Sequence, residues 1–223
     1  MAQIKQIDSL TIGDMELYPD IYGGLAEGLI ELPCPESIKI GQESYHVPAT
    51  MEELSDNICY GQRLYLCRKE ENDITLSVRI LLGYYYPYMT DSKWNEEKLL
   101  LFREKVLTCK AKDVYPITVM FTNLIKDIAE RERELLHREP SKMEIAAGIE
   151  KLDAFAELNA LDFLRDAMKI TIEEVLLTPY NECLVRFLNA KELSEYQNRY
   201  YEIMRKDVTP NKSKYQNARG NEA

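Results

Sequence analysis

Apolar residues recur every three or four positions along most of the chain, a spacing that predicts a succession of amphipathic helices. The stretch from Ser37 to Val47 has a different period, because apolar and polar side chains alternate there. This alternation around a central Gly-Gln-Glu-Ser predicts a β-hairpin with one apolar face. A lone hairpin is only marginally stable in water, so this one must lie on helices or add strands to a neighbour. We therefore expect a mainly α fold, a multi-helix bundle with one small β-hairpin at about residues 37–47.

Most of the expected helices begin at a start signal, a polar residue that can cap the first turn. An acid three residues later can bond back to the capping residue and close a capping box. The signals are Thr11–Asp14, Thr50–Glu53, Asp56–Asn57, Asp113–Pro116, Ser141–Glu144 and Thr171–Glu174. For the start at Asp113–Pro116, the sequence predicts that Pro116 lies in the first helical turn. A backbone N–H in that turn has no partner within the helix, so a proline loses no hydrogen bond there.

Three further stretches differ in how much of their surface is apolar. Residues 74–86 are apolar almost all round, which predicts a central helix buried on most sides, and Pro87 is expected to end or kink it. Lys98–Lys110 is amphipathic. The helix after Pro116 has one apolar face and runs into Glu130–Glu134, an alternating charge run typical of a solvated helical surface with local ion pairs.

A long apolar stripe follows Pro140 and predicts one long helix that needs a partner helix. Its members are Ile145, Ile149, Leu152, Phe155, Leu158, Leu161, Leu164 and Met168. The break at Pro140 also predicts a boundary between an N-terminal helical unit with the hairpin, residues 1–138, and a C-terminal helical unit, residues 139–205. Residues 206–223 are polar and are expected to form a tail.

Composition and charge argue against nucleic-acid-binding, secreted and membrane-spanning proteins. The chain has 223 residues and a formal net charge of −10, from 38 acidic against 28 basic side chains. Such a charge repels polyphosphates, so no direct contact with nucleic acid is expected. The amino terminus lacks the apolar core of a signal peptide, and the longest apolar run, Ile80–Met89, is far too short to cross a bilayer. The sequence predicts a soluble protein that is not secreted by a signal peptide and has no membrane partner.

No pattern of chemically active side chains points to an enzyme. The two histidines, His46 and His137, have no ligand-spaced neighbours, and the five cysteines contain no CxxC pair, which predicts reduced core thiols. No glycine-rich stretch fits a phosphate loop. We therefore predict no catalytic residue, no metal site and no cofactor. The enzyme alternative requires scattered residues such as His46, Asp91 and Glu97 to converge.

Aromatic side chains are densest at Tyr84–Tyr86, with Tyr88 and Trp94 nearby. Core packing is the favoured interpretation because the preceding residues are apolar on every side, and a protein-binding hot spot is the alternative. The tail is expected either to stay disordered or to dock on an acidic neighbour through its basic and aromatic residues. The candidate partner-binding residues are Ile38, Ile40, Tyr45, Tyr85, Tyr88, Trp94, Tyr200, Lys212 and Tyr215.

Several stretches resemble proteins of tailed bacteriophages. The hairpin followed by Val47-Pro48, Ile58–Tyr65 (ICYGQRLY), and Tyr115-Pro116 ahead of a helix resemble small helical assembly proteins, most of all those of phages infecting gut Bacteroidales. The last third of the chain is similar to tail assembly chaperones and related virion proteins. The stretches that carry this second similarity are Ala147-Gly148, Ile172–Val175, Pro179-Tyr180 and Arg199-Tyr200. The resemblance implies a role in building or forming a virion, with no catalytic residues.

The expected function is that of a non-enzymatic structural or interaction protein in tailed-phage virion assembly, as a tail or neck component or a tail assembly factor. Its expected partners are other virion or tail proteins or a second copy of the chain, in the virion or in the host cytoplasm during assembly. The alternative is a helical adaptor or inhibitor that binds a host or phage enzyme, with an acidic surface that imitates nucleic acid. It ranks lower because acids and bases alternate, as in Glu130–Glu134, rather than gather on one face.

Overall fold

The computed structural model describes residues 7–68, 72–140 and 142–208. These residues form mostly helices, with one two-stranded antiparallel hairpin made by β1 (Ser37–Ile40) and β2 (Glu43–His46). The predicted fold class, mainly α with one small hairpin, is confirmed.

The chain divides into two compact units, Met1–Cys183 and Leu184–Ala223. The predicted boundary after Arg138 lies inside the first of these units.

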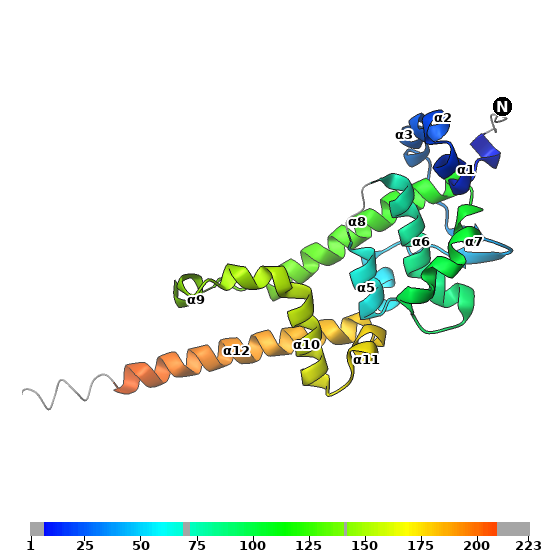
Figure 1. Cartoon of the computed structure of the whole chain (residues 1–223). Helices are drawn as coiled ribbons and strands as arrows, with labels where there is room; N and C mark the ends of the chain where they lie inside the picture. Colours follow the sequence, from blue (N-terminus) through cyan, green and yellow to red (C-terminus); the bar gives the residue numbers. More distant parts are fainter. Residues whose placement is uncertain (1–6, 69–71, 141, 209–223) are drawn as a thin grey trace, which may run out of the picture. The chain divides into compact units, whose positions relative to one another are not determined.

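Helix α6 (Asp73–Thr90) is the central helix of the first unit (Figure 1). Every residue from Ser77 to Tyr86 is buried, so the predicted central helix is confirmed. Helix α6 contacts elements that precede and follow it in sequence: α1 (Ile12–Leu17), α5 (Tyr60–Leu66), η3 (Glu96–Phe102), α7 (Arg103–Leu107) and α8 (Ala111–Leu136). The short elements nearer the amino terminus are η1 (Ile7–Ser9), α2 (Pro19–Tyr22), η2 (Gly23–Leu25) and α3 (Ala26–Ile30).

The sequence predicts that Pro87 ends or kinks helix α6, and Pro87 does not end it. The helix continues to Thr90 and closes at Asp91, which lies in the left-handed region with φ 48°. A proline inside a helix leaves the carbonyl four residues before it without its N–H donor. Here that carbonyl belongs to Gly83, and the buried side-chain amide of Gln62 donates to it at 2.8 Å. A side chain of α5 thus replaces the missing backbone donor and lets the helix continue.

Three predicted helix starts are confirmed. At α1 and α11 the threonine and the acid three residues later form a full capping box, and at α4 the threonine accepts the expected backbone hydrogen bond. The capping residues are Thr11 for α1, Thr50 for α4 (Met51–Asp56) and Thr171 for α11 (Ile172–Leu177).

The predicted start at Asp56–Asn57 is wrong, because these residues end α4 and α5 begins at Tyr60. The Cys59 N–H donates to the side-chain oxygen of Gln62 at 3.1 Å, so the same side chain that completes α6 also caps α5. The Tyr60 N–H donates to the carbonyl of Thr178 at 2.9 Å, which joins this turn to the end of α11. Contacts between distant segments therefore set the start of α5.

Helix α8 also begins at a position set by a distant segment. It starts at Ala111, earlier than the predicted start at Asp113–Pro116, so Pro116 lies in the second turn instead of the first. The chain ahead of α1 forms an antiparallel bridge beside this start, and the Ala111 N–H donates to the carbonyl of Leu10 at 2.8 Å. The first N–H groups of a helix have no partner within it, and this bond supplies one from a distant segment. The residues around Ala111 alone do not indicate it.

The hairpin lies on the helices of the first unit. In its register Ile38 pairs with Tyr45, and its two-residue loop begins at Gly41, whose φ of +65° favours glycine. Ile38 is 1% exposed, so the predicted apolar face of β1 is buried. The hydroxyl of Tyr85 donates to the carbonyl of His46 at 3.0 Å and joins the hairpin to α6.

The predicted single helix after Pro140 is wrong. Gly148 has φ +80° and interrupts the helical path, and a 3-10 helix follows it. Ser141, the capping residue of the prediction, lies outside the described residues. Leu164 is fully buried, and the helix that carries it contacts α11. The elements of this stretch are α9 (Lys142–Ala146), η4 (Ile149–Phe155) and α10 (Ala156–Met168).

Helix α12 (Tyr180–Val208) begins in the first unit, and its residues from Leu184 onward are the described part of the second unit. Within the second unit, the carboxylate of Glu195 pairs with Lys191 at 3.9 Å and with Arg199 at 3.5 Å. Residues 206–208 of the predicted tail are helical, and the rest of that tail, residues 209–223, lies outside the described residues.

Candidate functional site

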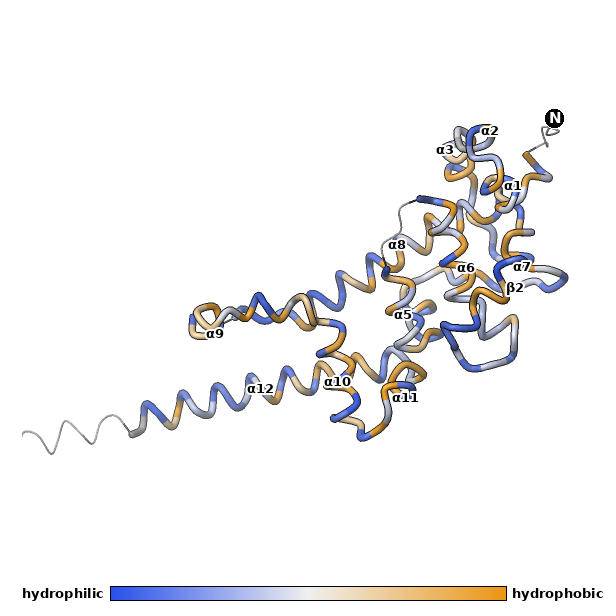
Figure 2. The backbone as a smooth tube through the Cα atoms, in the orientation of Figure 1, coloured by the Kyte–Doolittle hydropathy of each residue, from blue (hydrophilic) through white to orange (hydrophobic). Residues whose placement is uncertain are grey.

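The segment from Lys142 to Leu158, which we call the apolar segment, is the clearest candidate for an interaction surface. Figure 2 shows the run of apolar positions around α9. Five large apolar side chains of the segment are more than half exposed. They are Met143 (84%), Ile145 (56%), Leu152 (57%), Phe155 (57%) and Leu158 (52%). A single exposed apolar residue is common on a protein surface, whereas a group of them is typical of an interaction site.

The helix type of η4 brings several of these side chains onto one edge. A 3-10 helix has three residues per turn, so side chains three positions apart lie one above the other. Ile149, Leu152 and Phe155 have this spacing, and Leu158 follows at the same interval in α10. The apolar segment therefore presents a line of apolar side chains.

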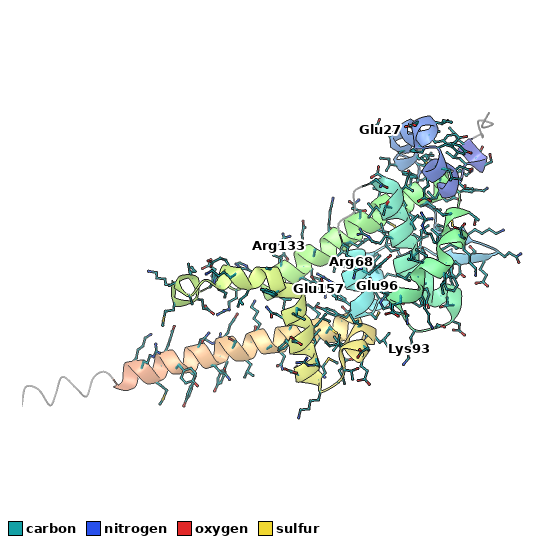
Figure 3. The ribbon with its side chains drawn as sticks, in the orientation of Figure 1. Glu27, Arg68, Lys93, Glu96, Arg133 and Glu157 are labelled. Atoms are coloured by element: carbon teal, nitrogen blue, oxygen red, sulfur yellow. The ribbon has the colours of Figure 1, made fainter. Side chains whose placement is uncertain are left out.

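The helix that follows this edge, α10, is held against the rest of the first unit by both apolar and charged residues. Leu164 is fully buried, and Glu157 lies close enough to Arg68 to contribute to that residue's electrostatics (Figure 3). The hydrogen bond to Glu96 at 3.1 Å, then the charge of Glu96 and, after it, the charge of Glu157 raise the pKa of Arg68, while partial burial opposes the shift. Exposed pairs of this kind add little stability, so burial of Leu164 is the larger contribution.

A second candidate is a pocket of about 310 Å³ between β2, α4 and the C-terminal half of α6, which we call the tyrosine pocket. Its floor is formed by side chains that are almost fully buried, and its rim by side chains that reach solvent. The lining residues are Ser44, Tyr45, His46, Glu53, Asn57, Tyr84, Tyr85 and Tyr88.

Four tyrosine rings line this pocket and pack against one another. The ring centroids of Tyr84 and Tyr85 are 4.9 Å apart at an interplanar angle of 86°, and Tyr45 lies 5.8 Å from Tyr85. Tyr88 is 5.6 Å from Tyr84 and 6.4 Å from Tyr85, and its side chain is 46% exposed. The rings are tilted or edge-to-face rather than stacked, as aromatic pairs prefer.

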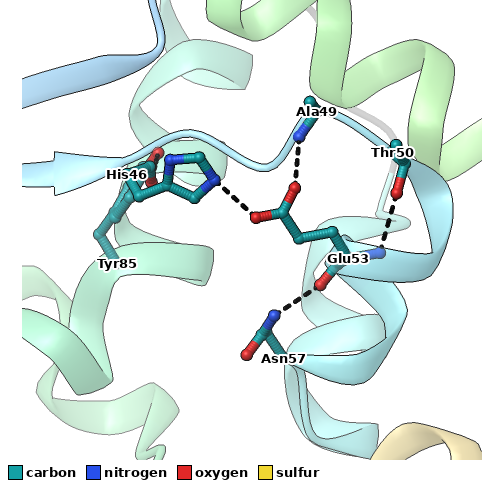
Figure 4. Close-up of polar contacts among 6 residues, drawn as sticks. All are labelled: His46, Ala49, Thr50, Glu53, Asn57 and Tyr85. Carbon is teal, nitrogen blue, oxygen red and sulfur yellow. Dashed lines mark hydrogen bonds and ion pairs between the residues drawn. The ribbon is translucent and has the colours of Figure 1, made fainter.

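Glu53 brings a fixed negative charge to the pocket (Figure 4). One carboxylate oxygen accepts a hydrogen bond from the Ala49 N–H at 2.9 Å, and the other lies 2.6 Å from Nε2 of His46. The Ala49 N–H, more than His46, lowers the pKa of Glu53 below its ordinary value. Since Glu53 is bound at both oxygens, and its backbone N–H and carbonyl bond to Thr50 and Asn57, its position is well defined.

Two of the four tyrosine hydroxyls that line the pocket donate hydrogen bonds within the fold. Tyr45 donates to the carboxylate of Glu43 at 2.5 Å, and Tyr85 donates to the carbonyl of His46. Burial, and then the hydrogen bond to Glu43 and the charge of that carboxylate, raises the pKa of Tyr45 to about 12, and burial raises the pKa of Tyr85 as well. These hydroxyls stay protonated near neutral pH, so they do not serve as bases there.

The predicted partner-binding residues fall into three groups. The first group is buried: Ile38, Ile40, Tyr85 and Trp94. For Tyr85 and Trp94, this agrees with the core-packing interpretation of the aromatic patch. The second group reaches solvent in part: Tyr45, Tyr88 and Tyr200. The third group, Lys212 and Tyr215, lies outside the described residues. Of the first two groups, Tyr45, Tyr85 and Tyr88 come together in the tyrosine pocket.

The residues of the enzyme alternative lie on separate elements. His46 ends β2 and contacts Glu53, Asp91 closes α6, and Glu97 is exposed in η3. Among the described residues, no group of three or more His, Cys, Asp or Glu side chains is placed to hold a metal ion. Likewise, no helix in the described part of the chain is both long and apolar enough to cross a membrane.

The five cysteines are free thiols in different environments. Cys109 and Cys183 are buried, as the prediction of core thiols expects, and burial raises the pKa of Cys109 to about 12. Cys34 is exposed, so the prediction is wrong for this residue.

One buried ion pair was not predicted. Glu132 belongs to the charge run that the sequence assigned to a solvated surface, but its carboxylate accepts a bidentate pair of hydrogen bonds from Arg63 of α5, one of them at 3.0 Å. Both side chains are about four-fifths buried. The sequence does indicate that Glu132 faces the core, because it follows Leu124 and Ile128 at four-residue intervals on the buried face of α8.

Comparison of the chain with protein-family models, curated proteins and solved structures gives no significant match.

Proposed function

We propose that this chain is a non-enzymatic structural or interaction protein of tailed-phage virion assembly, which acts by binding another virion or tail protein through its apolar segment. The observation that carries this proposal is the exposure of five large apolar side chains between Met143 and Leu158. The resemblance of the sequence to phage assembly proteins supplies the biological setting.

The chemistry of the apolar segment supports a protein partner. Apolar area removed from water stabilises a complex by roughly 25 cal/mol per Å², before the costs of association. The line of side chains from Leu152 through Phe155 to Leu158 has the regular spacing that helical segments use when they dock in an apolar groove. Phe155 supplies an aromatic side chain of the kind that often dominates such interfaces.

The test is mass spectrometry of purified, DNA-filled virions, of tail and neck assembly intermediates, and of the infected-cell lysate, with this chain quantified in each. A fixed ratio to the portal protein in virions identifies a structural component. Presence in intermediates with absence from virions identifies an assembly factor. Absence from both, with the chain abundant in the lysate, would contradict the proposal and favour the adaptor or inhibitor alternative.

A further inference from the structure

We infer that the tyrosine pocket binds an organic cation, an alkylammonium or guanidinium group of the kind that lysine and arginine side chains carry. The pocket is formed by β2, α4 and α6, apart from the apolar segment, so this inference does not rest on the proposed function.

The aromatic lining is the first reason. A cation is attracted to the face of an aromatic ring, and several rings around one cavity form an aromatic cage that selects ammonium groups. In the tyrosine pocket, Tyr84 and Tyr85 stand almost perpendicular to each other, and Tyr45 and Tyr88 lie within 6.4 Å of one or both of them. Tyr84 and Tyr85 are buried at 4% and 1% exposure and form the packed aromatic base, whereas Tyr45 and Tyr88 reach solvent and offer ring surface to a ligand. The cavity of about 310 Å³ is large enough for an ammonium or guanidinium group with part of its apolar stem.

The charge of the pocket is the second reason. Glu53 is part of the lining, and the hydroxyl of Tyr45 is bonded to a second carboxylate, that of Glu43. The lining residues of the pocket include no lysine or arginine, and the one basic side chain among them is His46, which contacts Glu53. Tyr88 lies in the last turn of α6, where the helix dipole also favours a cation.

Accessibility is the third reason. Tyr88 is 46% exposed and the side chain of Glu53 is 33% exposed, so a ligand can reach both from solvent. His46 contacts one oxygen of Glu53, but a carboxylate offers about four acceptor positions. A bound cation can therefore pair with Glu53 while the bonds to Ala49 and His46 remain.

The experiment is an NMR titration of the full chain, with tyrosine rings isotopically labelled and with three probes of similar size. The probes are the N-acetyl methylamides of lysine, arginine and norleucine, the last being the neutral control. We expect the two cations to shift the ring signals of the pocket and norleucine to leave them unchanged. Equal binding of norleucine would overturn the inference, because apolar contact would then explain the pocket.

Two variants test the assigned residues. Tyr88→Leu keeps an apolar side chain but removes a ring, and Glu53→Gln removes the charge but keeps an oxygen for the Ala49 N–H. Tyr88→Leu is expected to weaken binding of the lysine probe roughly 3- to 30-fold, the range that cation–π energies imply, and Glu53→Gln up to roughly 5-fold, the range of a partly exposed ion pair. Tyr18→Leu is the matched control, because Tyr18 is 44% exposed and does not line the pocket. Unchanged affinity in both pocket variants, or an equal loss in the control, would overturn the inference.

A last pair of probes identifies the source of the cation. Tetramethylammonium represents a free small cation, and a short peptide with one central lysine represents a protein partner. Tighter binding of the peptide assigns the pocket to a partner's side chain, and tighter binding of tetramethylammonium assigns it to a small molecule. If neither probe binds, the inference is wrong.

Discussion

Helix α6 and the apolar segment are both rich in apolar residues, yet the first unit buries one and exposes the other. Every residue of α6 from Ser77 to Tyr86 is buried, whereas five large apolar side chains between Met143 and Leu158 are more than half exposed. The difference lies in what surrounds them. Helix α6 is enclosed by α1, α5, η3, α7, α8 and the hairpin, whereas α10 packs mainly on α11 and η4. The apolar content of a helix therefore shows that one of its faces is favourably buried. Contacts between segments distant in sequence determine whether that face is buried within this chain.

The largest expected effect comes from matched leucine truncations in the two regions. Leu81→Ala should lower the free energy of unfolding by about 2–5 kcal/mol, because Leu81 is fully buried and its loss leaves a cavity. Leu152→Ala should change it by less than about 0.5 kcal/mol, because Leu152 is 57% exposed. Urea unfolding followed by circular dichroism measures both. Similar losses in the two variants would show that the isolated chain buries its apolar segment. That result would contradict the difference in burial between α6 and the apolar segment.

The enclosed region should also depend on its buried ion pair. Glu132→Gln should lower the free energy of unfolding by about 1–3 kcal/mol, because it leaves Arg63 partly buried without a full charge partner. Glu134→Gln, in the same helix but exposed, is the control and should change little. Urea unfolding of both variants gives the difference. Equal stability of the two variants would mean that the charge run is solvated after all, as the sequence alone suggested.

Gly61 and Gly28, both in the first unit, differ in how much space surrounds them. A Cβ at Gly61 would lie 2.9 Å from the carbonyl oxygen of Leu176 and 2.8 Å from Nε1 of Trp94, so Gly61→Ala should destabilise the fold by about 1–3 kcal/mol. Gly28→Ala, in α3, meets no atom within 4 Å and should stabilise it by about 0.4–1 kcal/mol. Trp94 is the single tryptophan, so its fluorescence reports both unfolding and the local change. A neutral effect of Gly61→Ala would contradict the packing of α5 against α11.

The smallest expected effect concerns α11, which lies against both α5 and α10. The Thr171 N–H donates to Glu174 at 2.9 Å, and this bond lowers the pKa of Glu174 from its ordinary value of 4.5. A lowered pKa in the folded state stabilises the fold above pH 4.5, and this stabilisation is lost as the pH falls through the lowered pKa. Wild type should therefore exceed Glu174→Gln in stability at pH 7, with the gap closing in acid. A gap that does not depend on pH would exclude this origin.

Local features of the fold could be predicted from the sequence. The capping boxes at Thr11 and Thr171 each involve residues three positions apart, and the hairpin follows from alternation over eleven positions, so neighbouring residues suffice. The starts of α5 and α8 could not be predicted, because bonds to Thr178 and Leu10 determine them.

The candidate sites were predictable in part. The apolar stripe from Ile145 to Met168 was recognised and was expected to need a partner helix, but its division by Gly148 and its exposure were not foreseen. The sequence places Tyr85 and Tyr88 in one aromatic patch but gives no indication that Tyr45 meets them. Their convergence with Glu53 depends on how β2, α4 and α6 pack, and no local pattern encodes that arrangement.

The most direct test of the central claim compares incorporation of two charge-matched variants into phage particles. The double substitution Leu152→Glu with Phe155→Glu disrupts the apolar edge, and Lys151→Glu changes the net charge by the same amount at an exposed position beside it. We expect both variants to fold as the wild type does, with the double variant lost from virions or assembly intermediates and the control retained. Equal incorporation of the two, measured by mass spectrometry relative to the portal protein, would contradict a role for the apolar segment in assembly.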